Sequence, residues 1–142
     1  MGGMDLFSAG PVGVVVRRWP TLAAVVAVVV FFADGGSEPT PFAVLLPVMA
    51  VLYLVFGGLR GDLWHRGEFA LQTAGVLAFG GIALAVQAAD GSLARYLLAG
   101  GWLAHGVWDF VHHRRDRVVP RAWSEWCGVV DVLGAAALLF VP

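Results

Sequence analysis

The sequence is organised around the stretch Ala104-His-Gly-Val-Trp-Asp-Phe-Val-His-His-Arg-Arg-Asp-Arg117, which holds three of the four histidines of the chain. Successive residues of an α-helix are separated by about 100°, so His105, Asp109 and His112, at i, i+4 and i+7, form one stripe. Asp116 continues the stripe if the helix extends that far. Ionisable side chains inside an apolar segment are costly and indicate a functional site by default. This stretch therefore predicts a helix that carries a polar stripe.

The composition of the chain is that of a membrane protein. Of its 142 residues, 59% are hydrophobic and 13% are charged, and the mean hydropathy is +0.80. Soluble domains carry about 25% charged residues. The net charge of −1 gives no reason to expect a nucleic-acid partner. The single cysteine, Cys127, excludes an internal disulfide and a cysteine-based metal framework. We expect one all-α domain over residues 1–142, a polytopic integral membrane bundle surrounded by the lipid bilayer.

The apolar runs predict five transmembrane helices, at residues 19–33, 42–59, 68–87, 93–112 and 122–141. The first run is short, because about 20 residues are needed to cross a bilayer. We expect part of Val12–Val16 to lengthen it. A secretory signal is the alternative, although no small-x-small cleavage pattern ends this run. Residues 34–41 form an acidic loop, and the second helix is expected to be kinked near Pro47.

The arginines predict the orientation. Only Arg95 lies in one set of alternate loops, while the other set holds the remaining eight: Arg17, Arg18, Arg60, Arg66, Arg114, Arg115, Arg117 and Arg121. Cytoplasmic loops of membrane proteins carry an excess of basic residues. We therefore expect a cell-membrane protein with a cytoplasmic N-terminus.

The polar stripe is expected to meet an acid on the next helix. His105 lies about 10 Å from the cytoplasmic end of the fourth predicted helix, and Asp131 lies about 13 Å into the fifth. The short turn between these helices makes them antiparallel neighbours. Small residues near Asp131 allow close approach. His105, Asp109, His112 and Asp131 are thus predicted to converge, whereas Glu125 lies about 120° away from Asp131 around its helix.

Other residues on the cytoplasmic side are candidates for a supporting role. Glu68 and Gln72 share one stripe of the third predicted helix, and His65 precedes it. Trp102 and Trp108 flank the central stripe. Aromatic side chains there could shield a lipid chain or bind a cation, or they could be packing residues.

Imidazole and carboxylate groups in this pattern suit a metal. They are ligands for zinc, iron or manganese, and the i, i+4 spacing presents two of them on one helix face. The predicted ligands are His105, Asp109, His112 and Asp131. Alternatively, His105, Asp109 and Asp131 form a metal-free acid–base site. The acids could also pair with His or Arg only to fix helix packing.

The string His-x-x-x-Asp-x-x-His-His at 105–113 resembles the histidine boxes of membrane di-iron desaturases and hydroxylases. It is also similar to the His-x-x-x-Asp pairs of zinc transporters. The former families carry several boxes and the latter carry paired motifs on two helices, whereas this chain has one string. The resemblance covers nine residues and assigns no family.

These observations favour a membrane-embedded, metal-dependent or acid–base enzyme that acts on a lipid or isoprenoid substrate. His105, Asp109 and Asp131 would be its catalytic groups. A proton-coupled or divalent-metal transporter that works as a homo-oligomer is the main alternative, although the outer halves of the helices hold few polar residues. The third possibility is a non-catalytic membrane subunit or assembly factor.

Overall fold

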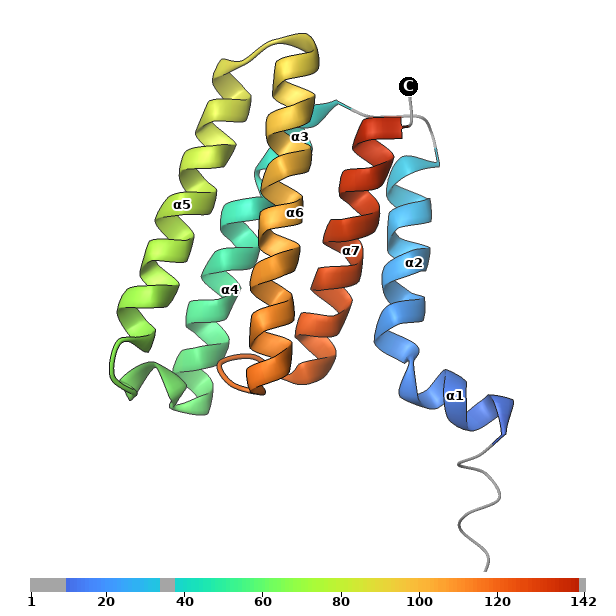
Figure 1. Cartoon of the computed structure of the whole chain (residues 1–142), viewed down its shortest axis with the longest axis vertical. Helices are drawn as coiled ribbons and strands as arrows, with labels where there is room; N and C mark the ends of the chain where they lie inside the picture. The colour runs from blue at the N-terminus through green and yellow to red at the C-terminus, as the bar shows by residue number, and fades with distance from the viewer. Residues whose placement is uncertain (1–9, 34–37, 141–142) are drawn as a thin grey trace, which may run out of the picture.

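The computed structural model describes residues 10–33 and 38–140, and this part of the chain is helical without strands (Figure 1). The prediction of an all-α fold is confirmed for these residues. The start of the chain, half of the predicted acidic loop and the last residue of the fifth predicted span lie outside them. The elements are α1 (Pro11–Arg17), α2 (Trp19–Phe32), α3 (Pro39–Ala43), α4 (Leu45–Arg60), the 3-10 turn η1 (Asp62–Trp64), α5 (Glu68–Ala88), α6 (Gly91–Arg115) and α7 (Arg121–Phe140).

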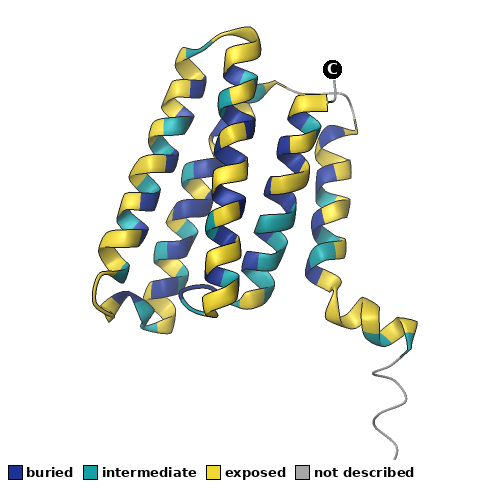
Figure 2. Ribbon diagram, in the orientation of Figure 1, coloured by how far each residue is buried: buried dark blue, intermediate teal, exposed yellow. Residues whose placement is uncertain are grey.

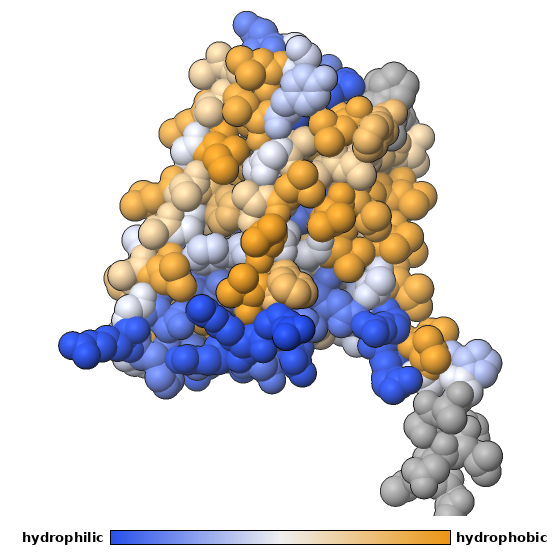
Figure 3. Space-filling model, viewed as in Figure 1, coloured by the Kyte–Doolittle hydropathy of each residue, from blue (hydrophilic) through white to orange (hydrophobic). Residues whose placement is uncertain are grey.

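Helix α6 is the centre of the bundle. It packs most extensively against α7, and it also contacts α5 and α4, while α2 packs against α7 at the edge (Figure 1). The α4–α5 and α6–α7 connections and the start of α2 lie together at one end, which we call the arginine-rich end. The most hydrophilic surface gathers there, as Figure 3 shows. The fold thus places the eight arginines that the sequence assigns to one side at one end of the bundle.

Three helical segments are long and apolar enough to cross a membrane, namely Pro39–Arg60, Glu68–Ala88 and Arg121–Phe140. The pair α1 and α2 makes a fourth if it is counted as one span, but the two helices meet at 72°. Val12–Val16 therefore belong to a separate helix, α1, and do not extend α2 as one straight helix. Pro20 explains the bend, because its ring would collide with the carbonyl of Val16 in a continuous helix.

One side of α6 is buried and the other is exposed, as Figure 2 shows, and the buried side carries the polar stripe. His105, Asp109 and His112 are at most 2% exposed. The residues that α6 exposes in its central part are apolar or aromatic: Leu93, Tyr96, Leu103, Val107 and Phe110. A surface helix of a water-soluble protein has the opposite arrangement. The buried polar residues lower the overall hydropathy of α6, which is why it is not among the three apolar segments.

The interruption of the second predicted span and the end of α6 each have a local cause. The second predicted span is interrupted at Val44, between α3 and α4, three residues before Pro47. A proline ring clashes with the carbonyl four residues earlier, here that of Ala43, so the break precedes the proline. Helix α6 runs on to Arg115, and Asp116 follows it in the left-handed conformation with φ 50°. Asp116 is exposed and does not continue the buried stripe.

Candidate functional site

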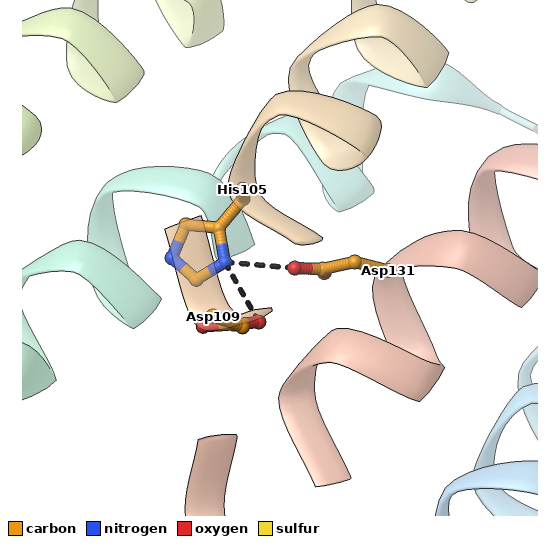
Figure 4. A group of neighbouring side chains, drawn as sticks. All are labelled: His105, Asp109 and Asp131. Carbon is orange, nitrogen blue, oxygen red and sulfur yellow. Dashed lines mark hydrogen bonds and ion pairs between the residues drawn. The ribbon is translucent and has the colours of Figure 1, made fainter. Parts of the chain in front are cut away.

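His105, Asp109 and Asp131 form a cluster at the contact between α6 and α7 (Figure 4). The Nδ1 atom of His105 lies 2.7 Å from Oδ2 of Asp131 and 3.4 Å from Oδ2 of Asp109. One potential ligand atom from each residue lies within 4.8 Å of the others, and all three side chains are fully buried. The structure therefore brings together three of the four predicted metal ligands.

Two glycines allow α6 and α7 to approach closely enough for this contact. A Cβ atom added at Gly128 would lie 3.3 Å from Cβ of Asp109, and one added at Gly106 would lie 3.4 Å from Cβ of Asp131. Each glycine thus packs against an acid of the opposite helix. Small residues at the contact of two apolar helices let their backbones come near each other.

Tyr53 of α4 completes the cluster, and sequence reasoning did not single it out. Its hydroxyl donates a hydrogen bond to Oδ1 of Asp109, and the residue is fully buried. Its ring lies edge-on to that of His105 at 5.9 Å between centroids, and the Phe79 ring lies 4.7 Å from His105 on another side. The sequence does contain a signal for this contact, because Tyr53 lies in a long apolar segment and a buried tyrosine hydroxyl usually has a hydrogen-bond partner.

The cluster leaves several polar atoms without hydrogen bonds. Within the described part of the chain these include Nε2 of His105, Oδ2 of Asp109 and Oδ1 of Asp131. Buried polar groups in proteins are nearly always satisfied. Two buried carboxylates beside one imidazole also need a compensating positive charge, supplied by protons or by a cation. The arrangement therefore requires either a shared proton or a bound cation.

Two separations between the ligand atoms can be compared with those around a metal ion. Ligand atoms at about 2.1 Å from a tetrahedral metal lie about 3.4 Å apart. The distance from His105 Nδ1 to Asp109 Oδ2 has this value, 3.4 Å. The distance from His105 Nδ1 to Asp131 Oδ2 is shorter, 2.7 Å. The shorter contact is that of a charge-assisted hydrogen bond. The same three residues could thus share a proton or, after Asp131 moves slightly, hold a metal.

His112 faces a different partner. Its Nδ1–H donates to the backbone carbonyl of Trp108 at 2.8 Å, so its Nε2 can accept from the Gln72 amide at 2.9 Å. Gln72 also lies 3.5 Å from Oε2 of Glu68, near the arginine-rich end. The Tyr53 ring contacts that of His112 at 4.8 Å between centroids. His112, Gln72 and Glu68 therefore form a polar branch beside the cluster, and His112 is not one of its three convergent groups.

The remaining predicted residues lie in packing positions or outside the site. Trp102 is buried and packs over Gly134, where any side chain would enter its ring, and Trp108 packs on Gly75. His65 is exposed in the α4–α5 connection, where its ring contacts Asp62 rather than the cluster.

Asp62 joins the two connections at the arginine-rich end. Its Oδ2 accepts a hydrogen bond of 2.9 Å from the backbone N–H of Val118, which has φ 72°. This hydrogen bond lowers the pKa of Asp62, and Arg60 and Arg117 act in the same direction. A β-branched residue rarely adopts positive φ, so the contact helps to hold an unfavourable turn.

Comparison with known proteins adds no further constraint on the site. No protein-family model matches the chain, and no match is found to a curated protein or to a solved structure.

Proposed function

We propose that the chain is an integral membrane protein of five spans, with α1 lying along the membrane surface and the arginine-rich end in the cytoplasm. The outer surface of the helices, which is apolar even on α6, supports this topology. With its 25 residues, α6 is about 37 Å long, more than the roughly 30 Å of a hydrocarbon core. The concentration of arginines at one end supports the orientation.

Cysteine labelling in intact cells tests this topology. Cys127→Ser removes the native thiol, and Arg66→Cys or Ser92→Cys then places a single thiol at the arginine-rich or the opposite end. A membrane-impermeant maleimide is expected to label the second variant in intact cells and the first only after lysis. Labelling of both in intact cells, or the reverse pattern, would exclude the proposed orientation.

We further propose that the protein is a metal-dependent enzyme that acts on a lipid or isoprenoid substrate. Its ligands are His105, Asp109 and Asp131. One observation carries this proposal: three ligand-type side chains converge in an apolar bundle, and Oδ2 of Asp109 and Oδ1 of Asp131 have no hydrogen-bond partner there. Such a metal would supply Lewis-acid activation. Tyr53 would orient Asp109 through its hydrogen bond, as outer-shell partners of metal ligands do.

The bundle interior favours an enzyme over a transporter. Between the cluster and the end opposite the arginines, the described core residues on the inner faces of α6 and α7 are apolar, including Ala94, Leu98, Ala135 and Leu138. An ion pathway needs polar groups or water along its length. The polar residues instead lead from the cluster towards the arginine-rich end.

A metal-free acid–base site is the second candidate. It is favoured by the 2.7 Å contact between His105 and Asp131, which suits a shared proton. The catalytic groups would be the same three residues, so the metal content of the protein separates the two candidates.

Elemental analysis of the purified protein is therefore the decisive experiment. We expect near-stoichiometric zinc, iron or manganese in the wild type, and its loss in His105→Ala and Asp131→Asn. His65→Ala is the matched control and should retain the metal. A metal-free wild type would refute the metal-dependent mechanism. Lipid analysis of cells that express the wild type or Asp131→Asn then tests the enzyme itself, and identical lipid profiles would refute it.

A further inference from the structure

A groove of about 300 Å³ lies next to the cluster, on the side of the bundle where α2 packs. Residues of α2 and α6 line it together with residues of α7. Gly106 and Gly128 are part of its lining, and these glycines pack against Asp131 and Asp109. Two of the residues that line the groove are therefore direct neighbours of the acids of the cluster.

Polar side chains gather at the arginine-rich end of the groove. Thr21 donates a hydrogen bond of 2.5 Å to Oε1 of Glu125, and Arg18 lies 3.6 Å from the same oxygen. On the other side, the Ser124 hydroxyl lies 3.3 Å from Nδ1 of His113. The Ser124 hydroxyl also donates to the backbone carbonyl of Arg121 at 3.1 Å, so both hydroxyl oxygens retain the capacity to accept a hydrogen bond, and the charges of Arg18 and Glu125 are paired.

The opposite end of the groove is apolar. Phe110, Val129 and Val132 line it beside the two glycines. Ser124 and Val132 are eight residues apart on α7, so the groove extends about 12 Å along the helix. A head group at the arginine-rich end and an apolar chain directed towards the middle of the bundle would match this distribution.

We propose that this groove binds an uncharged amphiphile with a hydroxylated head group, such as a monoacylglycerol or a prenyl alcohol. Hydroxyls suit the head-group end because they donate and accept hydrogen bonds without adding charge to a balanced pair. An anionic head group would compete with Glu125 for Arg18. The inference goes beyond the proposed function, because it assigns a lipid-binding site beside the cluster whose lining includes Gly106 and Gly128 but none of the three proposed catalytic residues.

Binding of 1-monooleoylglycerol to the detergent-purified protein tests the inference. Its anionic counterpart, oleoyl lysophosphatidic acid, has the same chain and serves as the comparison ligand. We expect the wild type to bind the uncharged lipid at least tenfold more tightly. Thr21→Val removes one hydroxyl and should weaken binding about two- to tenfold, the range of a neutral hydrogen bond.

A larger side chain in the groove provides an independent test. Val132→Trp should weaken binding of 1-monooleoylglycerol at least tenfold. Leu84→Trp places the same ring in the apolar groove of α4 and α5 and should change binding less than twofold. Tighter binding of the phosphate lipid, or equal effects of the two tryptophan substitutions, would overturn the proposal. Because Val132 is half-exposed, the substitution should not prevent folding.

The test of the lipid site can fail or succeed independently of the test of the proposed enzyme. Binding of 1-monooleoylglycerol, metal content and lipid turnover are three separate measurements. Groove-dependent binding without metal or lipid turnover would support the lipid site and refute the metal enzyme. Bound metal with turnover, but without groove-dependent binding, would refute the lipid site alone.

Discussion

The hydrogen bond from Tyr53 to Asp109 is expected to contribute measurably to folding, and Tyr53→Phe removes it while keeping the ring. A hydrogen bond to a charged group contributes about 1.5–3 kcal/mol. Interhelical hydrogen bonds in a membrane protein average about 0.6 kcal/mol and reach about 1.7. Tyr53 is fully buried and its acceptor is a carboxylate, so its hydrogen bond belongs to both classes. The two ranges overlap between about 1.5 and 1.7 kcal/mol. We expect a loss of about 1.6 kcal/mol, roughly a 15-fold change in the folding equilibrium constant.

Reversible unfolding in mixed micelles, followed by tryptophan fluorescence, measures this loss. Tyr96→Phe is the control, because Tyr96 is 62% exposed and should tolerate the change. In an Asp109→Ala background, Tyr53→Phe should cost much less, since its hydrogen-bond partner is already absent. The reasoning would be refuted if Tyr53→Phe had no more effect than the control, or if its cost were the same in both backgrounds.

Two further predictions concern other parts of the bundle. At pH 7, Asp62→Asn should lower the free energy of unfolding by about 1 kcal/mol, because it weakens the partly exposed contacts of Asp62 with Val118 and the arginines. The pKa of Asp62 is lowered in the folded protein, so its contribution is present above its ordinary pKa and disappears as pH falls through the lowered value; thermal unfolding from pH 7 to 3 should show the wild type and the variant converging. Gly134→Ala should destabilise the protein by about 1–3 kcal/mol, since the added methyl group enters the Trp102 ring. Gly100→Ala, at a position with no atom within 4 Å, should be tolerated, and equal melting temperatures for the two variants would contradict this packing.

The helical repeat and the distance of each residue from the α6–α7 turn were sufficient to predict that His105, Asp109 and Asp131 meet. The i, i+4 spacing places His105 and Asp109 on one face, and counting from the α6–α7 turn brings Asp131 to their level. These relations depend only on helix geometry and a short connection. The contact of Tyr53 depends instead on how α4 docks beside α6, which involves distant parts of the chain and has no periodic signature.

Side-chain orientation accounts for most of the remaining differences. His112 lies on the predicted stripe, but its ring donates to the Trp108 carbonyl and faces Gln72. His65 precedes α5 as expected, yet the 3-10 turn directs it towards Asp62. Both outcomes depend on local hydrogen bonds that residue spacing does not specify. The separate direction of α1 follows from Pro20, whose effect on a preceding helix is sterically predictable.

In the proposed membrane topology, the polarity of α6 bears on how the chain would enter the bilayer during synthesis. An aspartate at the centre of an inserting helix costs about 2.5–3.5 kcal/mol, so α6 is a poor candidate for independent insertion. The helices that cover its polar face lie on both sides of it in the sequence, because α4 and α5 precede it and α7 follows. Stable insertion of α6 would then require α7 to have been synthesised. Insertion of α6 and assembly of the cluster would then be one event. A ribosome that stalled before residue 121 would leave α6 without α7, and the uncovered polar residues of α6 would be recognisable to membrane quality control.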